Sequence, residues 1–248
     1  PSFLVYPIVA QLSAAKAVEV PLENHTIDLQ AVREAMTQNT RMVFICNPNN
    51  PTSTYIGRND VERFMNTVRE ETIIVFDEAY FEYVTADDYP DTIAMITDHP
   101  NIVVTRTFSK IYSLSGLRIG YAVADPGFVE CMHRIRQPFN VNRIAQAAAR
   151  AAIANADKVR EIVEENRREL EFLTAEMEKL GFEVPPSQTN FILAFPPAGT
   201  SGLADALLDR GIIVRPMKPY GLGEETIRVS VGTPYENRRF VDVLREVL

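Results

Sequence analysis

The chain has 248 residues and a formal net charge of -8 at pH 7, and 46% of its residues are hydrophobic. This composition can form a substantial core in one or two domains, and the negative charge argues against nonspecific nucleic-acid binding. No apolar run approaches the ~18 residues that a membrane span needs. The two cysteines, Cys46 and Cys131, have no paired spacing, and the three histidines show no metal-ligand spacing. We therefore expect a cytoplasmic protein with no structural disulfide, metal site, membrane contact or nucleic-acid partner.

Helices and strands alternate along residues 1–157. Asp28 can cap a first helix, and Asn59 or Asp60 can cap a second one, each followed by apolar residues at helical spacing. Apolar segments between the helices predict strands. This alternation predicts an α/β fold, a mainly parallel sheet sandwiched by helices.

The first of these strands, residues 43–46, ends in the sequence Asn-Pro-Asn-Asn-Pro-Thr over residues 47–52. Proline restricts the residue before it, so Asn50 is held in an extended conformation within a rigid turn. A turn without any binding role explains the prolines equally well.

The next strand, residues 73–76, is followed directly by Asp77. A carboxylate at this place could face a pyridine nitrogen and keep it protonated, and Tyr80 could donate to a phenolic oxygen of the same ring. The alternative for Asp77 is a structural one, a helix cap or a turn residue.

The run from Arg106 to Gly120 places a single lysine, Lys110, among hydroxyls, a glycine turn and an arginine. Apolar residues before and after the run predict two buried strands that deliver this polar loop to a sheet edge, where ligands gather. Lys110 could hold pyridoxal phosphate as an imine, while Thr107, Ser109 and Arg118 surround its phosphate. A solvated loop with an ordinary surface lysine is the alternative.

The last third of the chain differs in composition and in its predicted elements. An alanine-rich segment, residues 143–154, leads to a charged helix for which Asp157 fits an N-cap and Gly181 a C-terminal stop. Strands around Phe191, Ile213 and Val229 follow. We expect a cofactor-binding domain over 1–157, a connecting helix over 158–181 and a small α+β domain over 182–248.

The order of these motifs resembles the fold-type I pyridoxal-phosphate aminotransferases, and among them most the histidinol-phosphate aminotransferases. The resemblance runs through the whole chain. It implies that Lys110 is the imine lysine, that Asp77 contacts the pyridine nitrogen and that Asn50 and Tyr80 bind the ring oxygen. Thr107, Ser109 and Arg118 become phosphate ligands. One departure is Ser53, where the family usually has glycine; a positive φ there would be strained.

The resemblance also predicts substrate contacts in the two strand arginines near the C-terminus. The family arginine that matches Arg228 binds the substrate carboxylate or its equivalent, and the one that matches Arg215 contacts the phosphate of histidinol phosphate. A guanidinium suits both anions because it donates a forked pair of hydrogen bonds. Asn50 also lies among the implied substrate contacts. Solvent-facing strand arginines that pair with acids are the alternative.

The segment from Phe3 to Pro7 resembles the middle of the family's large domain. We therefore interpret the sequence as a fragment with a truncated large domain, and an inactive fragment is one of the alternatives. The family forms homodimers with the active sites at the subunit interface, which predicts a homodimer. An amino donor and a 2-oxo acid, implied to be glutamate and 2-oxoglutarate, are the expected small-molecule partners.

Three functions compete on these motifs. Histidinol-phosphate transamination in histidine biosynthesis is favoured by Arg215 and Arg228. An aromatic-amino-acid aminotransferase or a threonine-phosphate decarboxylase would use the same scaffold. The third alternative is a noncatalytic effector-binding domain or an inactive fragment, although an intact Lys110, Asp77 and Tyr80 argue against decay of the site.

Overall fold

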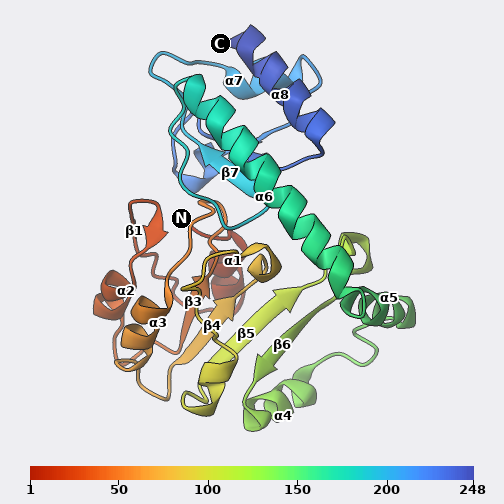
Figure 1. Ribbon diagram of the computed structural model, residues 1–248. Coiled ribbons are helices and arrows are strands. Elements are labelled where there is room, and N and C mark those ends of the chain that lie inside the picture. Colours follow the sequence, from red (N-terminus) through yellow and green to blue (C-terminus); the bar gives the residue numbers. More distant parts are fainter.

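A computed structural model describes all residues from 1 to 248. It contains a four-stranded sheet, a three-stranded sheet and a long helix, α6 (Ala156–Lys179), that runs from one to the other (Figure 1). A two-stranded hairpin of β1 (Leu22–Glu23) and β2 (Thr26–Ile27) lies beside the larger sheet. None of the helices is both long and apolar enough to cross a bilayer.

The larger sheet has the order β3-β4-β5-β6. Its strands are β3 (Met42–Cys46), β4 (Ile73–Asp77), β5 (Ile102–Thr107) and β6 (Gly120–Ala124). The first three strands are parallel and β6 is antiparallel to β5. This confirms the predicted α/β class. Because β4 and β5 are buried on both faces, they appear in the sequence as continuous apolar runs rather than alternating ones.

Helices α2 (Leu29–Ala35) and α3 (Arg58–Met65) pack together against this sheet. Their apolar faces form one core with the strands; Val61, Phe64, Ile74, Phe76 and Ile102 are among its members. Burial of this apolar surface stabilises the sheet by roughly 25 cal/mol per Å² removed from water. The core therefore holds the strand ends, and the loops that follow them, in fixed positions.

The smaller sheet has the order β7-β9-β8 and is antiparallel throughout. Its strands are β7 (Phe191–Ala194), β8 (Arg215–Pro216) and β9 (Ile227–Ser230). Helices α7 (Leu203–Leu208) and α8 (Pro234–Val247) and the C-terminal half of α6 cover it (Figure 1). The resulting core is separate from that of the larger sheet. The division at residues 157 and 181 stays a prediction.

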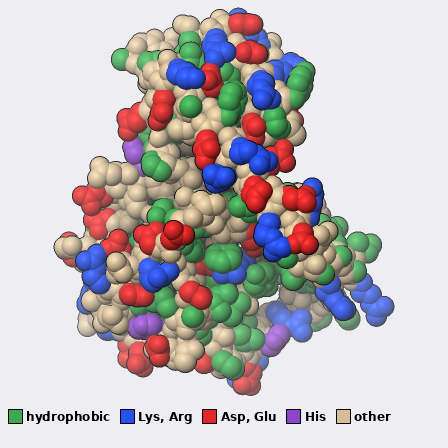
Figure 2. Space-filling view, viewed as in Figure 1, with side chains coloured by type: hydrophobic (Ala, Val, Ile, Leu, Met, Phe, Trp, Pro, Cys, Tyr) green, Lys and Arg blue, Asp and Glu red, His purple; other side chains and the backbone are tan.

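The remaining helices lie at the edges of these units. They are α1 (Val5–Leu12), α4 (Pro126–Ile135), α5 (Arg143–Ile153) and the 3-10 turns η1 (Phe81–Tyr83), η2 (Ala94–Thr97), η3 (Ser115–Leu117) and η4 (Lys218–Tyr220). Figure 2 shows hydrophobic side chains gathered on the surface over α4 and α5.

The helix signals were only partly predicted correctly. Asp28 caps α2 as predicted, because its carboxylate accepts from the backbone N–H groups of Gln30 and Ala31. Helix α3 forms where the sequence predicts a helix, but the predicted cap is wrong, since Gly57 is its N-cap and Asp60 lies in the first turn. Helix α6 begins before Asp157, which lies in its first turn. Asn59 and Asp157 have helix-capping chemistry, but the chain enters each helix before it reaches them.

Two strand predictions were also partly wrong. The strand predicted around Ile213 consists only of Arg215 and Pro216 and does not include Ile213. Strand β6 forms as predicted, but its residues Gly120, Tyr121 and Ala122 are exposed, because no further strand of this chain pairs with its outer edge. A left-handed Gly181 ends α6, as the sequence predicts.

Candidate active site

The carboxyl ends of β3, β4 and β5 lie side by side at one edge of the larger sheet. Cys46 at the end of β3 is paired in register with Asp77 at the end of β4, and Asp77 is paired with Thr105 on β5. The loops that follow these strands carry most of the predicted site residues. Parallel strands bring their chain ends to one edge in this way, so the topology assembles residues that are far apart in sequence.

Asp77 is the most central acid of this edge. The Tyr6 hydroxyl of α1 donates to Asp77 Oδ2 at 2.6 Å, and the Ala79 N–H donates to Oδ1 at 3.2 Å. Burial raises the pKa of Asp77, an effect that the Tyr6 hydrogen bond partly offsets. The neighbouring Cys46 thiol has its pKa raised to about 12, mainly by burial, so it stays a neutral thiol beside this carboxyl group.

Lys110, in the loop after β5, lies next to the ring of Tyr80, in the loop after β4. The Lys110 ammonium lies 5.1 Å from the centroid of the Tyr80 ring, and Tyr80 is almost fully buried. Burial lowers the pKa of Lys110, and the positive charge of Arg228 lowers it further, whereas Asp77 opposes the shift. A lysine with a lowered pKa has a larger fraction of neutral amine at neutral pH, the form that attacks carbonyl groups.

Arg228 and Asn50 join the two sheets of the protein. Arg228 on β9 donates through Nη1 to Asn50 Oδ1, across 178 positions of sequence. Its Nε is buried and has no hydrogen-bond partner. An unsatisfied buried donor on a cation is costly, and an anionic ligand beside it would remove that cost.

The turn that holds Asn50 is buried. Its peptide bonds before Pro48 and Pro51 are cis. Ser53 closes the turn with φ at 65°, which confirms the positive φ considered from the sequence. A serine is strained in this left-handed region, where glycine is free of that cost.

Arg215 lies directly opposite Arg228 in the register of β8 and β9, and its side chain is exposed. Like charges directly opposite each other in an antiparallel pair destabilise the sheet. The structure thus brings together the two arginines that the sequence suggested for anion binding, on one face of the smaller sheet.

The three predicted phosphate ligands lie along one loop. Thr107 Oγ1 accepts from the Ser109 N–H at 3.0 Å, which turns the chain just before Lys110. Arg118 is exposed, has a left-handed backbone with φ at 52° and donates to the Ser115 carbonyl at 2.6 Å. No contact joins Arg118 to Thr107 or Ser109, so the structure places these three residues on one loop without bringing their side chains together.

A buried ion pair lies on the opposite face of the sheet from Asp77. Glu78 is fully buried and pairs with Arg106, whose Nε and Nη2 lie 2.9 and 2.8 Å from Glu78 Oε2. Thr92 donates to the other carboxylate oxygen, and the Phe81 ring lies 3.4 Å beneath the Arg106 guanidinium. This pair connects the ends of β4 and β5, directly next to Asp77 and Thr107.

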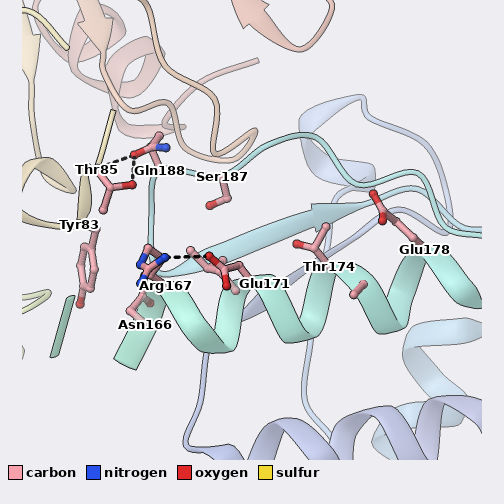
Figure 3. Close-up of a pocket in the computed structure, with 11 residues that line it drawn as sticks. Tyr83, Thr85, Asn166, Arg167, Glu171, Thr174, Glu178, Ser187 and Gln188 are labelled. Carbon is pink, nitrogen blue, oxygen red and sulfur yellow. Dashed lines mark hydrogen bonds and ion pairs between the residues drawn. The ribbon is translucent and has the colours of Figure 1, made fainter. Parts of the chain in front are cut away.

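A polar pocket of about 420 Å³ lies where α6 meets the segment before β7. Figure 3 shows Asn166, Arg167, Glu171, Thr174 and Glu178 on α6, facing Ser187 and Gln188 on that segment. Gln188 Oε1 accepts from the Thr85 N–H at 2.7 Å, and the Gln188 N–H donates to the Ser53 carbonyl at 3.0 Å. The pocket holds none of the predicted site residues.

Several residues of the site escaped the sequence reasoning. Tyr6 lies in the segment from Phe3 to Pro7, for which the sequence suggests only a resemblance to the family's large domain. The sequence also gives no sign of the Glu78–Arg106 pair, although Glu78 directly follows Asp77. Phe191, which touches both Tyr80 and Arg228, reads in the sequence as an ordinary strand residue. The contacts of Tyr6 and Phe191 cross more than 30 positions of sequence, so local patterns carry no signal for them.

The donor set fits pyridoxal phosphate. Lys110 supplies an amine with a lowered pKa, Asp77 a buried carboxyl group for a ring nitrogen, and Tyr80 and Asn50 polar groups for a ring oxygen. The unpartnered Nε of Arg228 marks a place for an anion beside them. These residues are therefore chemically suited to a phosphorylated pyridine aldehyde and an anionic substrate.

Comparison with known proteins agrees with this chemistry. The family model for aminotransferase class I and II matches residues 1–244. The chain is 45% identical to the histidinol-phosphate aminotransferase of Akkermansia muciniphila, over 100% of this chain and 67% of that protein. It is 41% identical to an aromatic amino acid aminotransferase of Mycobacterium sp. (strain KMS), over 98% of this chain and 67% of that one.

A solved structure supports the same assignment. The histidinol-phosphate aminotransferase from Sinorhizobium meliloti, determined in complex with pyridoxal-5'-phosphate, superimposes with a TM-score of 0.89 at 29% sequence identity. The alignment covers 100% of this chain and 69% of that structure. The chain thus spans about two thirds of the length of the relatives it matches.

Proposed function

This chain belongs to the class I and II aminotransferase family, and we propose that it catalyses the transamination of histidinol phosphate with 2-oxoglutarate in histidine biosynthesis. The observation that carries the substrate assignment is the register of β8 and β9, which sets Arg215 opposite Arg228. A phosphorylated amine offers one of these guanidiniums its phosphate, and the 2-oxo acid offers its carboxylates.

We assign roles to the residues around Lys110 as follows. Lys110 would hold the cofactor covalently, and as a free amine it would take up and return the proton at the substrate carbon; the lowered pKa of Lys110 suits it to this task. Asp77 would hold the pyridine nitrogen, and Tyr80 and Asn50 would donate hydrogen bonds to the ring oxygen. When bound, pyridoxal phosphate supplies the electron sink for the charge left on that carbon.

The remaining residues hold the two anionic ends. Thr107, Ser109 and Arg118, which lie at or after the end of β5 near Lys110, would hold the cofactor phosphate; in this structure the Ser109 N–H donates to Thr107 Oγ1. Arg228 binds the carboxylate of the oxo acid through its free Nε, while Asn50 orients its Nη1. The Tyr6 hydroxyl occupies one oxygen of Asp77, so Tyr6 shares or yields this contact when the ring nitrogen binds.

The direct test of the imine site is Lys110→Ala. Borohydride reduction of the protein mixed with pyridoxal phosphate, followed by peptide mapping, should give an adduct at Lys110 in the parent protein and none at that position in the variant. Transamination should be abolished in the variant while its circular dichroism spectrum is retained. Substantial turnover by Lys110→Ala would overturn the assignment.

The substrate is tested separately. Histidinol phosphate, phenylalanine and threonine phosphate are compared side by side with the parent protein and with Arg215→Met. We expect histidinol phosphate to be preferred and Arg215→Met to raise its KM without a similar effect on phenylalanine. The similarity to the Mycobacterium aromatic amino acid aminotransferase favours phenylalanine as the second candidate. Decarboxylation of threonine phosphate, or cofactor binding without turnover, would point to the other two alternatives.

We also propose that the protein is a cytoplasmic homodimer. The surface over α4 and α5 carries several exposed apolar side chains, among them Ile135, Phe139 and Ile144, and patches of this kind mark interfaces. Both cysteines are unpaired, which fits a reducing compartment. Light scattering of the cofactor-loaded protein would give twice the subunit mass for a dimer.

A further inference from the structure

Phe191 occupies a special place in the smaller sheet. It is the first residue of β7, is 2% exposed and shares a sheet face with Leu193, which pairs with Arg228 on β9. The alternate residues of β7, Ile192 and Ala194, face the opposite side and belong to the core under α7 and α8. Phe191 therefore points away from that core and toward the active site.

The Phe191 ring contacts two proposed site residues at once. The Arg228 guanidinium carbon lies 4.8 Å from its centroid, and the Tyr80 ring meets it edge to face at 5.2 Å with an interplanar angle of 82°. Both arrangements are attractive, because the face of an aromatic ring is partly negative and attracts a cation or the partly positive edge of a second ring. Arg228 comes from the smaller sheet and Tyr80 from the loop after β4, so a single ring contacts a residue of each unit.

The backbone of Phe191 is itself held in place. The hydroxyls of Ser187 and Thr189 donate to its carbonyl at 2.7 and 3.0 Å, and its N–H donates to Thr189 Oγ1 at 3.2 Å. Asn166 on α6 donates to the Thr189 carbonyl at 3.0 Å. Figure 3 shows Asn166 on the helix and Ser187 on the segment that faces it. The ring thus has a rigid base that is anchored to α6.

We propose that Phe191 is a positioning residue, which holds the Arg228 guanidinium next to Tyr80 and Lys110 in the orientation that binds the carboxylate of the oxo acid. This inference rests on the proposed function. The Nη1 of Arg228 is already directed by Asn50, so the ring supplies the second constraint that leaves Nε free for the ligand. Arginine has several rotatable bonds, and a guanidinium that is already ordered binds an anion with a smaller loss of entropy.

The test uses Phe191→Leu in the cofactor-loaded protein, because leucine keeps the site apolar but removes the ring face. Phe240→Leu is the matched control, since Phe240 is also buried but belongs to the core of the smaller sheet, whereas Phe191 lies in a cluster with Tyr80. The ligand is glutarate, which has both carboxylates of 2-oxoglutarate but no reactive carbonyl. Its dissociation constant is measured by isothermal titration calorimetry, and thermal stability is measured alongside.

We expect Phe191→Leu to weaken glutarate binding by about 10-fold, a typical size for one lost cation–π contact together with the lost order of its cation. Phe240→Leu should lower the melting temperature at least as much but change the dissociation constant by less than twofold. In an Arg228→Lys background, Phe191→Leu should have little further effect on binding, because the group that it positions is gone.

Two results overturn the proposal and remain distinguishable. Glutarate binding by Phe191→Leu that equals that of Phe240→Leu refutes the role of Phe191 alone. A parent protein that forms the borohydride-stable adduct at Lys110 but does not bind glutarate refutes the proposed substrate chemistry as well.

Discussion

The buried pair of Glu78 and Arg106 gives a prediction whose size follows from the structure. In Arg106→Met the side chain keeps its apolar length, but the fully buried Glu78 carboxylate loses its only cation. Removing one partner of a buried ion pair typically costs about 3–5 kcal/mol, because the remaining charge stays desolvated. The cation–π interaction of Arg106 with the Phe81 ring is lost as well. We expect the free energy of unfolding, measured by urea denaturation, to fall by this amount.

An exposed ion pair provides the control. Arg63 pairs with Asp60 on the surface of α3, with a side chain that is 78% exposed. Surface pairs contribute roughly 0–1 kcal/mol, so Arg63→Met should hardly change the urea midpoint. The double variant Glu78→Gln with Arg106→Met should recover part of the loss, since the uncompensated charge is gone. Equal losses for Arg106→Met and Arg63→Met would refute the reasoning.

The pH dependence of the same variant has a defined sign. Burial raises the pKa of Glu78 above its ordinary value of 4.5, and removal of Arg106 raises it further. A carboxyl group with a raised pKa in the folded state binds protons more strongly there than in the unfolded chain, so stability falls as the pH rises through this window. The deficit of Arg106→Met should therefore be smaller at pH 5 than at pH 8. A deficit that is constant between these pH values would contradict this account.

Three further outcomes are expected. Burial and the positive charge of Arg228 lower the pKa of Lys110. Arg228→Gln should therefore shift the pH midpoint of the reaction of Lys110 with trinitrobenzenesulfonate upward, as followed by peptide mapping. An unchanged midpoint would contradict the electrostatic coupling. Gly120→Ala places a Cβ 2.8 Å from the Arg106 carbonyl oxygen of β5. It should lower the free energy of unfolding by about 1–3 kcal/mol and reduce the borohydride trapping of the cofactor at Lys110. Gly116→Ala, whose Cβ would meet nothing within 4 Å, should change neither quantity. Thr233→Ala removes the capping box of α8 and should lower the free energy of unfolding, measured in urea, by about 1 kcal/mol. A urea midpoint equal to that of the parent protein would contradict this prediction.

Local signals in the sequence were sufficient for much of the fold. The apolar runs before Asp77 and Lys110 predicted β4 and β5, because strands that are buried on both faces need no polar alternation. Asp28 predicted the start of α2 through the hydrogen bonds that its own carboxylate makes to nearby N–H groups. Both predictions depend on residues close together in the chain. The positive φ of Ser53 was suggested by the family resemblance, because the family usually has glycine at that position.

Tertiary structure alone decided how the site is assembled. The contacts of Arg228 with Asn50, of Tyr6 with Asp77 and of Arg106 with Glu78 join residues from 28 to 178 positions apart. The hydrophobic periodicity of the sequence does not predict such pairs, because the order of the strands and the packing of the two sheets around α6 determine which residues meet. The sequence determined which chemical groups are present and in which order. Folding determined which of them meet, because only the closed core brings the strand ends and the smaller sheet within hydrogen-bond distance.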